Sequence, residues 1–308
     1  MKSYNIAVIG ECMVELQKTS IGIQQSFGGD TLNTCLYLSR LTKDTNIQCS
    51  YVTGLGEDGF SRQMLDAWRT ENINTELVMT HSDKQPGLYY IETDDAGERS
   101  FVYWRSDSAA KYLFDREGTE TLIKKLMAFD AVYLSGITLA ILTAPGRKAL
   151  FSFLSEFKNK GGKVIFDNNY RPRLWESQIK ASYCYQKMLS YTDIALLTFD
   201  DEQALFGDEN VEQCVERTTE AGVYEIIIKR GSQDCLVIEG QDAQFVPANR
   251  INHVVDTTAA GDSFSAGYLA KRLLNGSAVE SARLGHLLAG RVIQHSGAII
   301  PVKHMPTI

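Results

Sequence analysis

DTTAAGDSFSAGYLA, residues 256–270, is the most informative stretch of this 308-residue chain. Small residues fill a core poorly, but they let a backbone approach a ligand closely. Gly261 and the two alanines before it leave backbone N–H groups accessible, and a helix predicted over 262–274 begins directly behind them. Because a helix N-terminus with free N–H groups favours anions, above all phosphate, the stretch predicts an anion-binding turn.

Asp262 stands where that helix begins. A carboxylate there could take a proton from an attacking hydroxyl group. An anion hole beside a base is what phosphoryl transfer to an alcohol requires, since positioning and charge stabilisation supply most of the catalysis. The alternative is that Asp262 only caps the helix, a frequent position for aspartate, and the stretch taken alone favours the cap.

Outward from this stretch, short apolar runs alternate with helical patterns. The runs lack polar alternation and therefore predict strands buried on both faces, at residues 5–10, 131–136, 163–169, 194–198 and 225–231. The helical patterns cover residues 30–41, 58–71, 119–128, 145–160, 178–190, 210–221, 262–274 and 277–294. This order predicts an α/β fold with a mainly parallel sheet covered on both faces, and ligands in such folds bind at the carboxyl ends of the strands.

Residues 86–105, PGLYYIETDDAGERSFVYWR, interrupt that rhythm. Two β-prone runs, 87–93 and 99–104, flank the turn DDAGE and predict a hairpin. Together with residues 12–27 the hairpin is expected to form a small sheet beside the main domain. The alternative is an extra edge of the main sheet.

Composition excludes several classes of function. The net charge of −7 argues against a nucleic-acid or acidic-membrane binder. Six scattered cysteines without a C-x-x-C pair are typical of reduced thiols. The first residues, MKSYNIAVIGECMVEL, contain only a brief apolar run, and no segment is long enough to span a bilayer, so we expect a cytoplasmic protein.

Two further stretches contain glycines that could lie against a ligand. Gly28 and Gly29 precede a helix, and Asp30 or Asn33 behind them could bind hydroxyl groups, although an ordinary capped loop is an equal alternative. The G-x-G within residues 52–65 lacks dinucleotide spacing, which makes a nicotinamide dehydrogenase a weak alternative.

Arginines follow two of the predicted strands. Arg171 and Arg173 come after the strand that ends in DNN, at Asn169, and Arg105 ends the hairpin. Their forked donors suit a carboxylate or phosphate, which suggests an anionic substrate, although exposed arginines are common. In KRGSQD, residues 229–234, Gly231 could approach a nucleotide phosphate or simply form a turn between strands.

The order GGDTLN, GLGEDGF, KRG and DTTAAGDSFSAGYL resembles the ribokinase-like (PfkB) family of sugar kinases over essentially the whole chain. Within the family, VIGECMVEL, GGDTLNT, the hairpin and VIFDNNYRPRLW are similar to kinases of the acid sugar 2-keto-3-deoxygluconate. The resemblance implies one doubly wound α/β domain over residues 1–308. It also implies a β-sheet lid from about 12–27 and 86–105 that closes over the sugar, and MgATP that phosphorylates the 6-hydroxyl group.

The resemblance also implies residue roles by motif position. Asp262 would be the general base, and the backbone of Ala259, Ala260 and Gly261 the anion hole. The sugar contacts would be Gly29, Asp30, Asn33, Tyr90, Arg105 and Arg171, with Arg105 for the carboxylate. The ATP contacts would be Asn169, Lys229, Gly231 and Gly297, together with residues 259–261.

Two positions depart from the family pattern. Ala259 replaces a usual glycine, and TFDDEQALFG places Thr198 and Asp201 where the family has Asn-x-x-Glu. Whether Asp201 or Glu202 orders the water of the magnesium ion therefore stays open. The substrate also stays open between the keto-deoxy acid, its C4 epimer and a neutral sugar such as fructose or ribose. A non-catalytic sensor is an alternative function. A requirement for a monovalent cation and a homo-oligomer formed through the lid are further open points.

Overall fold

The computed structural model of the protein describes residues 3–19, 22–93 and 99–308. Its main sheet has eight strands in the order β14-β13-β12-β11-β10-β9-β1-β4. Its strands are β1 (Tyr4–Ile9), β4 (Ile47–Val52), β9 (Ala131–Ser135), β10 (Lys163–Asp167), β11 (Ile194–Thr198), β12 (Glu225–Lys229), β13 (Cys235–Glu239) and β14 (Asp242–Val246). The strands from β4 to β12 run parallel, and β13 and β14 add an antiparallel edge.

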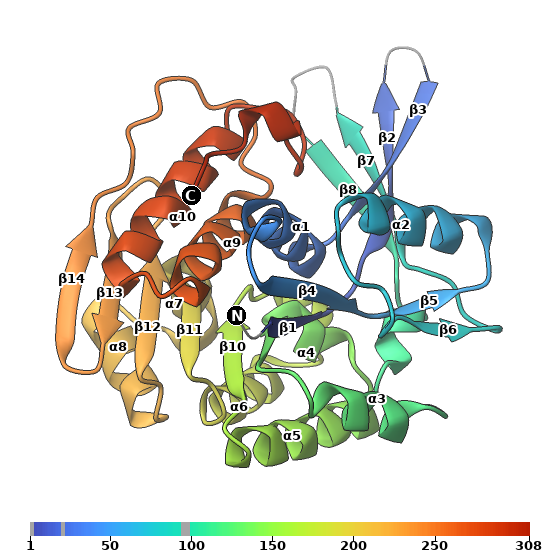
Figure 1. The fold of residues 1–308 in the computed structure, drawn as a ribbon, viewed down its shortest axis with the longest axis horizontal. Coiled ribbons are helices and arrows are strands. Elements are labelled where there is room, and N and C mark those ends of the chain that lie inside the picture. The colour runs from blue at the N-terminus through green and yellow to red at the C-terminus, as the bar shows by residue number, and fades with distance from the viewer. Residues whose placement is uncertain (1–2, 20–21, 94–98) are drawn as a thin grey trace.

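Helices cover both faces of this sheet (Figure 1). One face carries α1 (Asp30–Thr42), α2 (Gly59–Thr70), α9 (Ala260–Leu273) and α10 (Ala278–Val292). The other carries α3 (Thr119–Leu126), α4 (Gly136–Ile141), α5 (Ala144–Asn159), α6 (Gln178–Leu189), α7 (Phe199–Phe206) and α8 (Val211–Glu220). Short 3-10 turns are η1 (Ala109–Tyr112), η2 (Pro172–Leu174) and η3 (Val302–His304).

The protein has two apolar cores, one on each face of the main sheet, because successive side chains of a strand point to opposite faces. In β10, Ile165 packs toward the α9 side, whereas Val164 and Phe166 pack toward the α5 side. Both sets are fully buried, so the strand needs apolar residues at successive positions. The predicted mainly parallel sheet is confirmed, and all five predicted strands and eight predicted helices are present.

A second, smaller sheet stands beside the main one and has the order β3-β2-β7-β8 (Figure 1). Its strands are β2 (Met13–Thr19), β3 (Gly22–Gly28), β7 (Leu88–Thr93) and β8 (Arg99–Trp104). The extra-edge alternative is wrong, because within the described residues these strands form a sheet of their own, separate from the eight-stranded one. The predicted turn at 94–98 lies outside the described residues, and a lid function of this sheet stays a prediction.

Several elements of the structure were not predicted from apolar runs in the sequence. Strand β14 is exposed at four of its five residues, and the short α4 and α7 lie between predicted elements. Two short strands, β5 (Gly54–Gly56) and β6 (Met79–His81), pair in a separate two-stranded sheet. Of the helices in the described chain, none has the length and apolar character needed to cross a membrane.

Candidate active site

A cavity of about 530 Å³ lies at the carboxyl ends of β10, β11 and β12. Asp167, Thr198 and Lys229, the last residues of these strands, line it, as the parallel topology predicts. Its lining also contains Asn169, Arg171, Asp201, Gly231, Ala260, Gly261 and Asp262. Apolar side chains contribute to the lining as well, from Ile251, Val254, Phe264, Ala289 and Ile293. One cavity thus combines charged and apolar side chains.

Asp262 lies in the first turn of α9 and faces this cavity. The N-cap of α9 is Ala259, whose methyl group cannot accept a hydrogen bond, and Asp262 Oδ2 accepts one from Asn33 Nδ2 at 2.8 Å. The capping alternative for Asp262 is therefore wrong. Its carboxylate is held by another helix and turned toward the cavity.

Burial and crowding by like charges change the acidity of Asp262. Burial, and after it the charge of Asp30, raises the pKa of Asp262 to about 8, while the hydrogen bond from Asn33 lowers it. Burial also raises the pKa of Asp30. A carboxylate with a pKa near neutrality is well matched to proton abstraction, so this geometry suits a general base.

The start of α1 is fixed against two neighbouring segments. A Cβ atom on Gly29 would lie 2.2 Å from the carbonyl oxygen of Glu11, so only glycine fits there. Asn169 Nδ2 donates to Asp30 Oδ2 at 2.7 Å. Asn169 has a φ of 29°, a left-handed conformation that asparagine tolerates better than most residues. The predicted residues Gly29, Asp30, Asn33 and Asn169 thus form one cluster beside Asp262.

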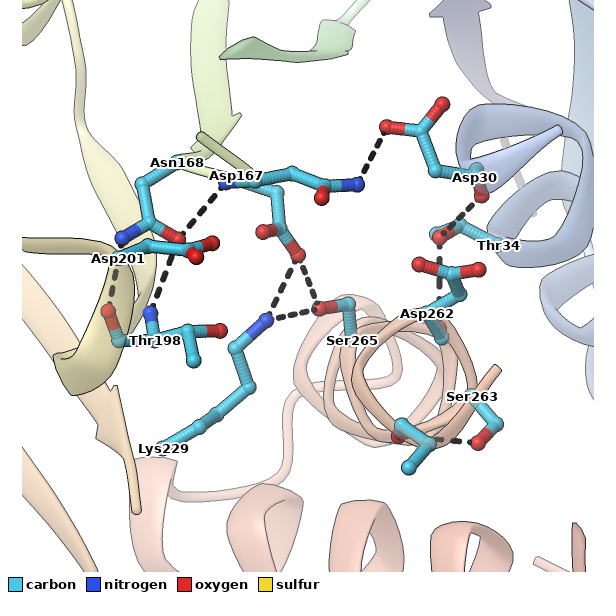
Figure 2. A network of polar contacts seen from close by, with 12 residues as sticks. Asp30, Thr34, Asp167, Asn168, Thr198, Asp201, Lys229, Asp262, Ser263 and Ser265 are labelled. Atoms are coloured by element: carbon cyan, nitrogen blue, oxygen red, sulfur yellow. Dashed lines mark hydrogen bonds and ion pairs between the residues drawn. The ribbon is translucent and has the colours of Figure 1, made fainter. Parts of the chain in front are cut away.

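Lys229 does not project freely into the cavity. Its Nζ lies 2.8 Å from Asp167 Oδ2, and the same oxygen accepts a hydrogen bond from Ser265 Oγ at 2.7 Å (Figure 2). It also accepts one from Tyr133 Oη at 3.4 Å. A Cβ atom on Gly261 would lie 3.6 Å from Lys229 Nζ. The ammonium group therefore lies directly behind the start of α9, where it adds to the positive end of the helix dipole.

The two candidate acids for magnesium are separated by the fold. Glu202 is buried, with Oε1 accepting from Asn168 at 2.8 Å and Oε2 paired with Arg217 at 2.6 Å. The prediction that Glu202 orders the magnesium water is therefore wrong, because both of its oxygens are already engaged away from the cavity. Asp201 lines the cavity, where Oδ2 accepts from Tyr170 N at 3.0 Å and Oδ1 lies 3.6 Å from Arg171.

Glu202 also belongs to a cluster of potential metal ligands with Asp208 and Cys214. Arg217 pairs with both carboxylates of this cluster, at 2.6 Å and 2.5 Å. The guanidinium group already neutralises them, so the cluster is a structural brace between α7 and α8 and not a metal site.

Tyr90 lies on the side of the small sheet that faces away from the site. It lines a separate groove of about 440 Å³ with Leu16, Phe60 and Trp104, whereas Tyr89 contacts Glu15 beside Gly28. Successive residues of a strand point to opposite faces. The sugar contact of Tyr90 stays a prediction, and Tyr89 is the tyrosine that lies beside Gly28.

Six other predicted residues are not among the described residues that line the cavity: Gly29, Asp30 and Asn33, which lie in the cluster beside Asp262, and Arg105, Gly297 and Ala259. Arg105 forms an ion pair with Glu11 beneath the small sheet. Gly297 donates its N–H to Asp256 Oδ2 at 2.8 Å and so supports the turn before α9 from behind. Ala259 is buried, and Ala260 and Gly261 are the residues of the predicted anion hole that line the cavity; the N–H of Ala260 donates to Thr257 O at 3.1 Å.

Sequence reasoning missed several residues that shape the site. Asp167 and Ser265 hold Lys229, and Asn168 bonds Thr198 through both its amide oxygen and its amide nitrogen (Figure 2). The only local signal for Asp167 is a charged residue that ends the buried run VIFD. Its partners come from β12 and α9, which the sequence does not reveal.

Fold and site together define a phosphotransferase that acts on a small alcohol, with a carboxylate base beside a helix start that can hold phosphate. The chain belongs to the PfkB family of carbohydrate kinases, because the pattern of the pfkB carbohydrate kinase family matches residues 3–305. The resemblance predicted from the motifs is thereby confirmed.

Three relatives illustrate where the chain stands in the family. It is 53% identical to the 2-dehydro-3-deoxygluconokinase of Escherichia coli (strain K12) over 307 residues, 99% of each chain. It is 51% identical to the protein of the same name from Dickeya dadantii (strain 3937) over 309 residues, 99% of this chain and 100% of that one. The fructokinase of Salmonella typhimurium is 26% identical over 280 residues, 90% of this chain and 87% of that one.

Solved structures agree on the fold. The 2-dehydro-3-deoxygluconokinase of Thermotoga maritima matches with a TM-score of 0.84 at 20% identity, over 97% of this chain and 95% of that one. The fructokinase of Xylella fastidiosa with bound ATP matches with a TM-score of 0.82 at 20% identity, over 98% and 95%. The predicted α/β fold with a smaller sheet is confirmed.

Proposed function

We propose that this protein is a 2-dehydro-3-deoxygluconokinase. It transfers the γ-phosphate of ATP to the 6-hydroxyl group of 2-keto-3-deoxygluconate and releases 2-keto-3-deoxy-6-phosphogluconate and ADP. The observation that carries this proposal is the 53% identity to the Escherichia coli enzyme of that name over 99% of both chains. The fructokinase relative, at 26%, supports a neutral sugar much less.

The residues of the cavity support a direct transfer. Asp262 accepts the proton of the 6-hydroxyl group while the bond from O6 to the γ-phosphorus forms and the bond to the bridging oxygen of ADP breaks. The N–H group of Gly261, with the positive end of α9 and Lys229 behind it, stabilises the charge on the moving phosphoryl group, whereas the N–H of Ala260 donates to Thr257 O at 3.1 Å.

The donor set fits ATP and magnesium. The apolar side chains of the lining, among them Ile251, Val254 and Ile293, offer a surface for the adenine ring. Mg²⁺, when bound with ATP, neutralises charge on the phosphates. Besides the proposed base Asp262, the cavity contains the carboxylates of Asp201 and Asp167, which would hold the ion or its water, because Mg²⁺ prefers oxygen ligands.

The sugar acid would bind on the side of α1 and the small sheet. Asn33 Oδ1 is buried without a hydrogen-bond partner in the described part of the chain and is free to accept a bond from a sugar hydroxyl group. Arg105 and Arg171 remain the candidates for the carboxylate, with Arg105 as the primary one.

Three expectations from the sequence also stay proposals. Six buried free thiols are typical of a reducing compartment such as the cytoplasm. The exposed aromatic residues Phe101 and Tyr103 of the small sheet would suit a homo-oligomer formed through that sheet. A monovalent cation near the active site is testable through potassium dependence of the rate.

ATP consumption by the purified protein with magnesium tests the function. The substrates are 2-keto-3-deoxygluconate, its C4 epimer, gluconate, fructose and ribose, compared by kcat/KM. We expect a strong preference for the keto-deoxy acids. Preference for fructose or ribose would retain the kinase and reject the substrate, and no turnover with ATP still bound would favour a sensor.

A further inference from the structure

Glu11 and Arg105 form a buried ion pair at the base of the small sheet. Glu11 lies between β1 and β2, where the chain enters that sheet, and Arg105 directly follows β8, where the chain leaves it. Their side chains are 1% and 12% exposed. The pair thus joins the points where the small sheet meets the main domain.

The pair is joined by a single contact, between Arg105 Nη2 and Glu11 Oε2. Arg105 Nε and Glu11 Oε1 are both buried, and neither has a hydrogen-bond partner within the described residues. A forked guanidinium–carboxylate pair would use both of these atoms. The guanidinium group therefore keeps donor capacity that Glu11 does not consume.

The surroundings direct the pair toward the sugar side of the site. The backbone oxygen of Glu11 packs against Gly29, next to Asp30. Burial raises the pKa of Asp30, and the charge of Arg105 is among the weaker effects that oppose this rise. Asp30 in turn bonds Asn169, in the cluster beside Asp262. Glu11 thus fixes Arg105 to the segment that contains the predicted sugar contacts.

We propose that Glu11 is a positioning residue that determines specificity for acid sugars. It holds the guanidinium group of Arg105 from behind, so that the remaining N–H donors meet the carboxylate of the substrate. Without Glu11 the guanidinium group has no fixed orientation before the substrate binds. Binding must then order this side chain, and the entropy cost lowers the affinity for the sugar acid. The inference rests on the proposed function, because it assumes a carboxylate on the substrate.

The test compares Glu11→Ala, Arg105→Ala and the double variant with the wild type, on 2-keto-3-deoxygluconate and ATP. We expect Glu11→Ala to raise KM for the sugar acid roughly tenfold to a hundredfold, the range of one charge-assisted hydrogen bond. KM for ATP should stay within about twofold. The double variant should be no worse than Arg105→Ala, because Glu11 acts through Arg105.

Glu71→Ala is the matched control. Glu71 pairs with Arg40, at side-chain exposures of 24% and 10%, at the far end of α1. Its removal should lower the melting temperature without raising KM for the sugar acid. If Glu11→Ala behaves like this control, or if the losses of the two single variants multiply in the double variant, the inference is wrong.

Gly87→Ala provides a second variant if Glu11→Ala does not fold. The added Cβ atom would lie 2.9 Å from Glu11 Oε1 and 3.1 Å from Arg105 Cβ, so it displaces the pair without changing its charge. KM for the sugar acid should rise here as well, and an unchanged KM would contradict the inference. A wild type that is inactive on sugar acids rejects the proposed function, whereas an active wild type with unaffected variants rejects only the role of Glu11.

Discussion

Asn33 donates a hydrogen bond of 2.8 Å to Asp262, across 229 positions of the sequence. Thr34, the next residue of α1, bonds the backbone oxygen of Asp262 at 3.3 Å. Helix α1 therefore holds both the side chain and the backbone of the proposed base. Because of this link, the carboxylate in the first turn of α9 has one fixed direction.

Asp262→Asn should abolish most turnover and leave the fold intact. The amide is nearly isosteric with the carboxylate but cannot accept the proton, and general-base catalysis typically contributes a factor of about 10² to 10⁴. Steady-state kcat with the best sugar, together with ATP binding and the melting temperature, measures the effect. Near-normal kcat would remove Asp262 from the role of base.

The kcat/KM of the wild type should rise with pH toward about 8, because Asp262 must be deprotonated to act and its pKa is raised to about 8. The bond from Asn33 lowers this pKa, so Asn33→Ala should move the acid limb of the profile to higher pH. Profiles of kcat/KM from pH 5.5 to 9.5 for both proteins provide the comparison. An acid limb that does not move would show that Asn33 does not tune the base.

Lys229→Met should destabilise the protein and weaken its binding of ATP. It leaves Asp167 buried without its cation, and loss of one partner of a buried pair typically costs about 3 to 5 kcal/mol of the free energy of unfolding. Adding Asp167→Asn should restore part of the stability and none of the affinity for ATP. Urea unfolding and KM for ATP separate the two effects. A double variant as unstable as Lys229→Met would contradict the pairing argument.

Asp201→Asn should raise the magnesium concentration needed for half-maximal rate, because Asp201 lines the cavity. Glu202→Gln should leave that concentration unchanged and lower the melting temperature, since Glu202 is paired with Arg217 inside the protein. Magnesium titrations of kcat at saturating ATP and sugar distinguish the two acids. The reverse pattern would return the magnesium role to Glu202.

The fold and the small-residue turn at the start of α9 were predictable because both depend on local sequence. A strand buried on both faces requires a continuous apolar run, as in Ala131–Ser135 and Glu225–Lys229. A helix start that can hold an anion requires small residues and an open turn, as at Ala260 and Gly261. These patterns occupy short stretches and need no partner from elsewhere in the chain.

The contacts that orient the site were decided by the tertiary structure. Asp201 and Glu202 are adjacent in sequence, yet the packing of α8 brings Arg217 to only one of them. Tyr89 and Tyr90 differ only in the face of the small sheet that each occupies, which depends on how β7 pairs with β2 and β8. The links from Glu11 to Arg105 and from Lys229 to Asp167 likewise join residues far apart in sequence, and only strand order and helix packing bring such residues within reach.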